Sequence, residues 1–136
     1  MSLITLTTDF GTKDHFVGAV KGAIYSELTD AKIVDITHEI SPFNITETAY
    51  ILKNSYKSFP EGTIHIVGVD SELSEDNKHI AIELDNHFFV CPDNGIISMI
   101  ASEIQPAKIV EINIHDRIES SFPVLDVFVK VACFIA

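Results

Sequence analysis

Residues 3–22 read LITLTTDFGTKDHFVGAVKG and set the pattern that the rest of the chain follows. The first six residues are apolar or β-branched, as in a buried strand. From Val17 onward apolar residues recur every three or four positions, which predicts a helix. The loop between strand and helix carries Asp9 and Asp14. We expect Asp14 to cap the helix, because a carboxylate there can accept hydrogen bonds from the free amides of the first turn.

Strand and helix patterns alternate along the remainder of the chain. Further strands are predicted at 31–36, 63–69, 79–84, 87–91 and 108–114. Asn44 and Glu47 form a capping box for a second helix. Two later stretches, 96–104 and 124–136, also have helical spacing of apolar residues.

This alternation indicates the fold class. Strands that alternate with helices favour an α/β fold, a mostly parallel sheet with helices on both faces. The dipeptide Asp85-Asn86 is a hairpin turn signal, so we expect one local hairpin in the sheet. The length of 136 residues favours a single domain over 1–136.

The charge balance is acidic. The chain has 20 Asp and Glu against 9 Lys and Arg, a formal net charge of −11 with His neutral. This argues against nucleic acid or an anionic membrane surface as a partner, since both require a basic face. No apolar run approaches the roughly 20 residues that cross a bilayer. Cys91 and Cys133 lie in apolar surroundings, so we expect buried thiols in a protein of the reducing cytoplasm.

The first loop does not match the common nucleotide-binding motifs. Its sequence DFGTKD has one glycine, whereas a dinucleotide fingerprint reads GxGxxG and a P-loop reads GxxxxGK followed by Ser or Thr. Asp9 would repel a phosphate but can accept two hydrogen bonds from the hydroxyls of a ribose. The alternative is that Asp9 only ends the strand in a turn. The six histidines show no metal-ligand spacing, and we expect no metal.

Open α/β sheets bind ligands outside the carboxyl ends of their strands. Asp70 follows the most apolar predicted strand, so it lies at this edge together with Asp9 and His38. The stretch after Asp70, SELSEDNK, is polar. It fits either a loop of the site or an ordinary solvated loop.

Four stretches together resemble the N-terminal domain of the S-adenosylmethionine hydroxide adenosyltransferases, relatives of the fluorinases and chlorinases. They are LTTDFGTKDHFVGAVKG, IVDITHEISPFNITETAYIL, FPEGTIHIVGVD and FFVCPDNGIIS. The resemblance implies a longer whole chain with a C-terminal β-rich domain. It also implies a homotrimer that binds S-adenosylmethionine or adenosine between subunits. The uncapped apolar stretch 124–136 agrees, so we expect this sequence to be the first domain of a longer chain.

The resemblance also implies roles for individual residues. Asp9 matches the aspartate that holds the ribose hydroxyls, and Asp14 matches a supporting acid of the same loop. Phe43 matches an aromatic position near the reacting carbon. Asp70 matches the acid of the hydroxide-forming branch, and Asn94 lies in the family signature PDNG.

Two positions depart from the hydroxide branch, which reads DPGVGTxRR where this chain reads DSELSEDNK. The arginine of the branch falls on Asn77, which we group with the substrate-binding residues, and Lys78 stands beside it. The histidine of the branch falls on Pro123. The candidate catalytic residues are therefore Asp70 and Lys78.

Three functions follow from the resemblance. The first is cleavage of S-adenosylmethionine by water or hydroxide at the ribose C5′ carbon, giving adenosine and methionine without a cofactor. The second is a protein that binds S-adenosylmethionine or adenosine but has lost turnover, since the Arg and His of the branch are replaced. The third is a structural trimer subunit without a small ligand, against which the retained ribose loop argues.

Overall fold

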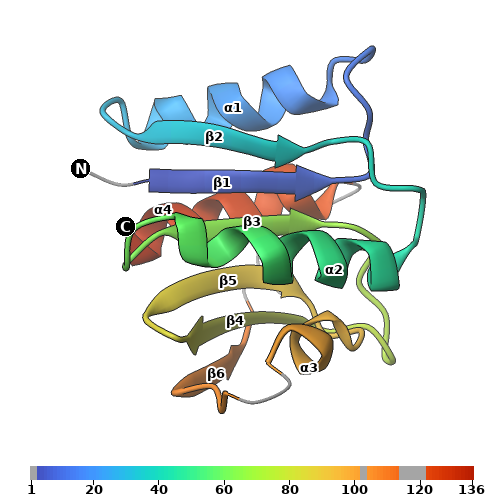
Figure 1. Ribbon diagram of the computed structural model, residues 1–136. Coiled ribbons are helices and arrows are strands. Elements are labelled where there is room, and N and C mark those ends of the chain that lie inside the picture. The colour runs from blue at the N-terminus through green and yellow to red at the C-terminus, as the bar shows by residue number, and fades with distance from the viewer. Residues whose placement is uncertain (1–2, 102–103, 114–121) are drawn as a thin grey trace.

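The strands form one sheet in a computed structural model that describes residues 3–101, 104–113 and 122–136. Their bounds are Leu3–Thr8 (β1), Lys32–Thr37 (β2), Ile64–Gly68 (β3), His79–Leu84 (β4), His87–Pro92 (β5) and Lys108–Glu111 (β6). The order is β2-β1-β3-β5-β4-β6 (Figure 1). The strands β2, β1, β3 and β5 run parallel, whereas β4 is antiparallel to both of its neighbours.

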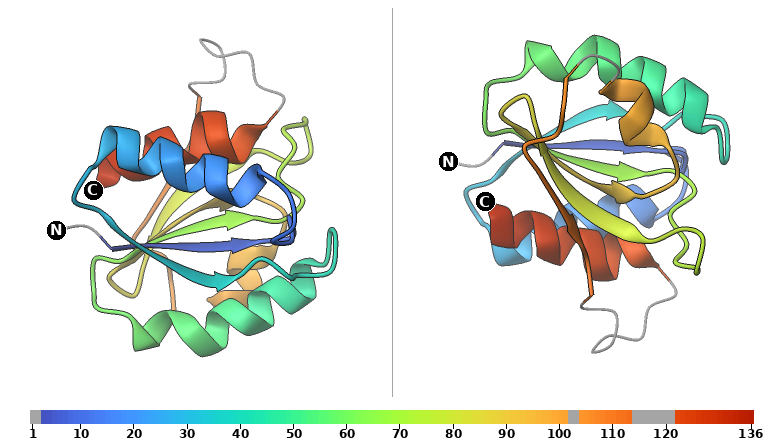
Figure 2. Two further views of the ribbon diagram at one scale, coloured as in Figure 1. Left: turned by 90° about the horizontal axis from the view of Figure 1, so that it is seen from above. Right: turned by 90° about the horizontal axis from the view of Figure 1, so that it is seen from below.

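Helices cover both faces of this sheet. They are Phe16–Glu27 (α1), Ile45–Ser55 (α2), Ile96–Ile100 (α3) and Val129–Ile135 (α4), with a 3-10 turn at Tyr56–Ser58 (η1) and a π-helical segment at Val124–Phe128 (η3). The helices α1 and α4 lie on one face, and α2 and α3 lie on the other (Figure 2). The predicted fold class is confirmed: a mostly parallel sheet between helices.

Each face of the sheet has its own hydrophobic core. On the α1 and α4 side, Ile4, Leu6 and Ile66 of the sheet pack with Val20 and Phe128. On the α2 and α3 side the core is a second cluster. Its members include Leu52, Val67, Ile82, Phe89 and Ile96. Strands buried on both faces are what a parallel sheet under two helical layers requires, and β1 and β3 are such strands.

The predicted hairpin is confirmed. Asp85 and Asn86 join β4 to β5 with φ angles of 52° and 62°. Positive φ at both central residues is the type I′ geometry, whose twist matches that of the flanking strands. Cys91 and Cys133 are buried free thiols, as expected.

The expected cap at Asp14 is wrong. The helix α1 begins at Phe16, its N-cap residue is His15, and that residue makes no side-chain capping bond. Asp14 precedes the N-cap position, so its carboxylate instead accepts hydrogen bonds from the backbone N–H and from the ring Nδ1 of His15, both at 2.7 Å. These bonds hold the pKa of Asp14 below its usual range.

Several element ends differ from the predicted ones. The strands β2 and β3 are Lys32–Thr37 and Ile64–Gly68 rather than 31–36 and 63–69, and β5 ends at Pro92 rather than 91. The third helix, α3, ends at Ile100 rather than reaching Ile104. The strand β6 ends at Glu111, and position 114, its predicted end, lies outside the described residues. None of the helices in the described part of the chain is long and apolar enough to cross a membrane.

Half of the predicted capping box of α2 is present and gives a stability test: Asn44 caps the helix, but its own N–H donates to the Ser41 carbonyl rather than to the Glu47 side chain. Asn44 Oδ1 accepts the Glu47 N–H at 3.0 Å. We expect Asn44→Ala to lower the free energy of unfolding by about 1 kcal/mol, because one helix N–H loses its partner. Asn44→Asp keeps the acceptor and serves as the control. Urea denaturation measures both, and an unchanged midpoint for Asn44→Ala would contradict the capping role.

Candidate functional site

A cleft of about 380 Å³ opens at the carboxyl ends of β1 and β3. These strand ends lie on the right in Figure 1. Its walls come from the loops after β1, β2 and β3, from the start of α1 and from the residues before η3. They are Asp9, Phe10, Phe16, Pro42, Phe43, Asp70, Ser71, Glu72, Phe122 and Pro123. Tertiary structure thus brings together Asp9, Phe43 and Asp70, at the edge where open α/β sheets bind ligands.

Asp9 links two of these loops. Its Oδ2 accepts a hydrogen bond from the Phe43 N–H at 3.1 Å, across 34 residues of sequence. Its own N–H donates to the Gly68 carbonyl at the end of β3. The carboxylate is therefore fixed relative to the Phe43 loop before any ligand arrives.

Backbone conformation marks two residues of the cleft. Phe43 has φ 62° and Asp70 has φ 51°, both in the left-handed region. Non-glycine residues rarely adopt it, and when they do outside a tight turn they often lie at functional sites. Among the described residues, the other non-glycine residues with positive φ are the two of the hairpin turn, where the turn requires it. The Phe43 side chain is 70% exposed at the rim of the cleft.

Two asparagine side chains that do not line the cleft form hydrogen bonds to the backbone of the Asp70 loop. Asn77 Nδ2 donates to the carbonyls of Asp70 and Glu72, at 2.7 and 2.8 Å. Asn94 Nδ2 donates to the Val69 carbonyl at 3.5 Å. The predicted substrate contacts of Asn77 and Asn94 stay predictions, and the contacts made here are to the backbone of the loop.

Three other positions were singled out from the sequence, namely Asp14, Lys78 and Pro123, and they differ in whether they line the cleft. Asp14 is exposed and pairs with His15. Lys78 is exposed, and its carbonyl accepts the Asp93 N–H at 2.6 Å. Neither is among the residues that line the cleft, whereas Pro123 is.

Sequence reasoning missed an aromatic wall in this cleft. The ring of Phe10 lies 5.9 Å from that of Phe16 and 5.3 Å from that of Phe122, centroid to centroid. The rings of Phe16 and Phe122 are 5.2 Å apart, edge to face. Phe10 and Phe16 flank the Asp9 loop in sequence and could have been suspected. Phe122 reaches the wall only through the packing of the last helical segment.

The cleft is acidic. Three carboxylates line it, those of Asp9, Asp70 and Glu72, and no Lys, Arg or His does among the described residues. Such a surface attracts a cation and repels a phosphate, and aromatic faces add cation–π attraction. The described residues contain no group of three or more His, Cys, Asp or Glu arranged to hold a metal.

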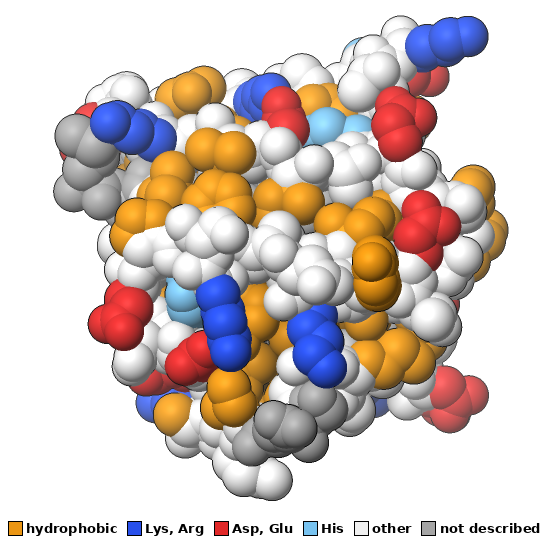
Figure 3. Space-filling model, viewed as in Figure 1, with side chains coloured by type: hydrophobic (Ala, Val, Ile, Leu, Met, Phe, Trp, Pro, Cys, Tyr) orange, Lys and Arg blue, Asp and Glu red, His pale blue; other side chains and the backbone are white. Residues whose placement is uncertain are grey.

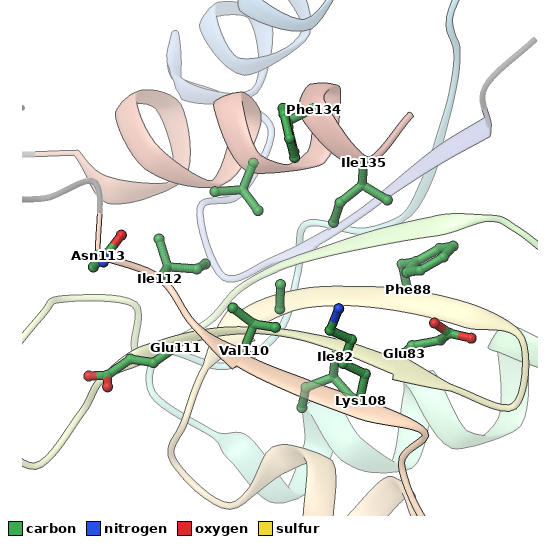
Figure 4. Close-up of a pocket in the computed structure, with 12 residues that line it drawn as sticks. Ile82, Glu83, Phe88, Lys108, Val110, Glu111, Ile112, Asn113, Phe134 and Ile135 are labelled. Atoms are coloured by element: carbon green, nitrogen blue, oxygen red, sulfur yellow. The ribbon is translucent and has the colours of Figure 1, made fainter.

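Elsewhere the surface is mixed. Figure 3 shows hydrophobic side chains interspersed with charged ones on the face that carries α2. A second hollow, of about 390 Å³, lies between β4, β6 and α4 (Figure 4). Its walls are mainly apolar, with Phe88, Val110 and Ile135 among them. None of the predicted site residues lines it, so the candidate site is the cleft at the strand ends.

Comparison with known proteins gives a family match over nearly the whole chain. Residues 4–136 match the family model described as the SAM hydroxide adenosyltransferase N-terminal domain. A relative from Methanocaldococcus jannaschii, named (R)-S-adenosyl-L-methionine hydrolase, is 41% identical over 118 residues, 83% of this chain and 44% of the relative. A relative of the same name from Salinispora arenicola is 30% identical over 138 residues, 98% of this chain and 52% of the relative.

A solved structure has the same fold. The crystal structure of an uncharacterized conserved protein from Thermotoga maritima superimposes with a TM-score of 0.89 at 35% identity, over 97% of this chain and 52% of that one. The chain therefore spans about half the length of the curated relatives it matches.

Proposed function

The chain belongs to the S-adenosylmethionine hydroxide adenosyltransferase family, and we propose that its cleft binds S-adenosylmethionine for cleavage by water to adenosine and methionine in the whole protein. The observation that carries this proposal is the meeting of Asp9, Phe43 and Asp70 in one acidic, aromatic cleft. The names of the two hydrolase relatives support it.

Each wall of the cleft suits one part of this ligand. The Asp9 carboxylate can accept hydrogen bonds from the two ribose hydroxyls, since it has lone pairs beyond the one used by the Phe43 N–H. The Phe43 ring would pack beside the ribose. The remaining carboxylates and the phenyl rings favour the positive sulfonium.

The chemistry requires a positioned water and a proton acceptor. The water oxygen attacks C5′ in line with the carbon–sulfur bond. That bond breaks with its electron pair going to sulfur, so methionine leaves as a neutral thioether. Asp70 takes the proton of the attacking water as general base and later passes it to solvent. Lys78 does not line the cleft, so we assign the proton transfer to Asp70. Because the sulfonium brings its own leaving group, the reaction needs no cofactor.

We further propose that the whole protein is a homotrimer in the cytoplasm and that this chain is its adenosyl-binding N-terminal domain, followed by a β-rich domain. The exposed ring of Phe43 borders the rings of Phe10, Phe16 and Phe122 in the same cleft, and an aromatic surface of this kind would be covered by a second subunit. The buried free thiols of Cys91 and Cys133 support a reducing compartment.

The test is to incubate the whole protein with S-adenosylmethionine in ¹⁸O-labelled water and to analyse the products by chromatography and mass spectrometry. We expect adenosine and methionine, with one labelled oxygen at the adenosine 5′ position. Absence of adenosine above the uncatalysed background would contradict the hydrolase. If calorimetry then still detected ligand binding, the replacement of Arg and His by Asn77 and Pro123 would favour the binding protein without turnover.

The acidity of the cleft predicts that it binds a positively charged ligand more tightly than a neutral one of similar shape. We expect the wild-type protein to bind S-adenosylmethionine about tenfold more tightly than its neutral thioether analogue, S-adenosylhomocysteine, at low salt. Glu72→Gln should reduce this ratio, because it removes one carboxylate from the wall. Glu75→Gln, on the same loop but outside the cleft lining, is the control. Equal affinities for the two ligands in the wild type would contradict the electrostatic argument.

A further inference from the structure

A line of four polar side chains runs beneath the loop that follows β1. It starts at Lys21 on α1, whose Nζ lies 2.6 Å from Asp35 Oδ2 on β2. Asp35 Oδ1 lies 2.7 Å from His38 Nε2. His38 Nδ1 in turn lies 2.7 Å from the Oγ1 of Thr8, the last residue of β1. His38 is 5% exposed and Thr8 1% exposed, so the inner half of the line is shielded from water.

When His38 is neutral, every group in this line has a partner of the matching kind, and the hydrogen bonds from Lys21 and from His38 converge on Asp35. The Lys21 ammonium can only donate and the Asp35 carboxylate can only accept. His38 therefore donates through Nε2–H to Asp35, and its bare Nδ1 accepts the Thr8 hydroxyl. Burial opposes the charge on Asp35, but hydrogen bonds from Lys21 and His38 outweigh it and hold the pKa of Asp35 below its usual value.

The line ends on the backbone around Asp9. With its proton given to His38, the Thr8 hydroxyl oxygen accepts the Phe10 N–H at 3.3 Å. The His38 carbonyl accepts the Gly11 N–H at 2.7 Å. The amides that follow Asp9 are thus tied to Thr8 and His38, and neither of these two residues lines the cleft.

We propose that His38 is a positioning residue for Asp9: anchored by Asp35 and Lys21, it fixes the Thr8 hydroxyl and with it the backbone that aims the Asp9 carboxylate into the cleft. The identity of the ligand that Asp9 receives rests on the proposed function. The positioning itself rests on the hydrogen bonds of the line.

The chain offers a matched control on the same strand. Thr5 Oγ1 lies 2.6 Å from His65 Nδ1, also buried, three residues before Thr8 on β1. The other ring nitrogen of His65, Nε2, lies 3.1 Å from His87 Nδ1, so this threonine–histidine pair is connected to His87 rather than to Asp9. Thr5→Val and Thr8→Val each remove one buried threonine–histidine hydrogen bond while keeping the side-chain shape. The two variants differ in the histidine whose bond is lost: His38 is connected to the Asp9 loop, whereas His65 is connected to His87.

The experiment compares these two variants in the full chain by three measurements. They are the affinity for S-adenosylmethionine by calorimetry, the exchange rate of the Phe10 and Gly11 amides by NMR, and the free energy of unfolding in urea. We expect Thr8→Val to weaken binding about tenfold and to speed exchange of the Phe10 amide, which loses its acceptor. Thr5→Val should destabilise the fold to a similar degree but leave both the affinity and these amides within about twofold of wild type.

Substitutions of His38 distinguish its contact with Thr8 from its contact with Asp35. An asparagine places its amide oxygen near the position of Nδ1 and can accept from Thr8, whereas an alanine cannot. We expect affinity and Phe10 protection to fall in the order wild type, His38→Asn, His38→Ala. In the Asp9→Asn background, Thr8→Val should change affinity little, because the residue that it positions has already been altered.

Two results would overturn the proposal. One is an equal loss of affinity in Thr8→Val and Thr5→Val, since both would then act only through stability. The other is unchanged exchange of the Phe10 amide in Thr8→Val. A wild-type whole protein that binds no S-adenosylmethionine would instead contradict the proposed function, and the exchange rate of the Phe10 amide alone would then test the positioning role of His38.

Discussion

Asp70→Asn is expected to lower kcat for adenosine formation by about 10²- to 10⁴-fold, the usual contribution of a general base. The amide cannot take a proton from the attacking water. It has nearly the same shape as the carboxylate, and asparagine tolerates the left-handed backbone that Asp70 adopts, with φ 51°. The bonds from Asn77 to this loop go to carbonyl groups and stay intact. The loss should therefore fall on turnover rather than on folding.

The measurement is steady-state kinetics of the whole protein, with calorimetric binding of S-adenosylmethionine alongside. Asp76→Asn, on the same loop but outside the lining of the cleft, is the matched control and should keep wild-type kinetics. A kcat for Asp70→Asn within about twofold of wild type would remove Asp70 from the mechanism, because such a change corresponds to well under 1 kcal/mol in the barrier.

Asp9→Ala is expected to weaken binding of S-adenosylmethionine and of adenosine about 100-fold. The substitution removes the proposed acceptors for two ribose hydroxyls. A hydrogen bond to a charged group contributes about 1.5–3 kcal/mol net of the exchange with water, and losing two at the lower end of this range gives a factor of about 100. It also frees the Phe43 N–H, which donates to Asp9 in the folded chain. Asp9→Asn retains one carbonyl oxygen and should lose less affinity.

Deoxyadenosines separate the ribose contact from a general disturbance of the loop. The wild-type protein should bind 2′-deoxyadenosine and 3′-deoxyadenosine more weakly than adenosine, whereas Asp9→Ala should bind all three about equally. Competition calorimetry measures these ratios. If the variant still distinguished adenosine from its deoxy forms as the wild type does, the hydroxyls would be held by other residues.

Local rules explain which parts of the fold were predictable. The alternation of apolar and helical patterns predicted the strands, the helices on both faces and the hairpin at Asp85 and Asn86. The cap at Asn44 followed from the spacing to Glu47. The cap at Asp14 was predicted wrongly, since the helix begins at Phe16 with His15 as its N-cap residue, and the Asp14 carboxylate accepts hydrogen bonds from His15. Capping preference alone does not determine the first residue of a helix.

For the site, the apolar runs showed that Asp9 and Asp70 come just after buried strands, because the end of an apolar run marks the end of such a strand. Their surroundings followed only from the folded chain. Phe122 joins the aromatic wall, Asn77 binds the backbone of the Asp70 loop, and His38 connects Asp35 to Thr8. Some of these contacts join segments that are distant in sequence, and the others depend on the conformation of a loop. The spacing of apolar residues along the chain predicts neither kind. They form where loops from different strands meet at one edge of the sheet, and these loops meet only after the strands have paired.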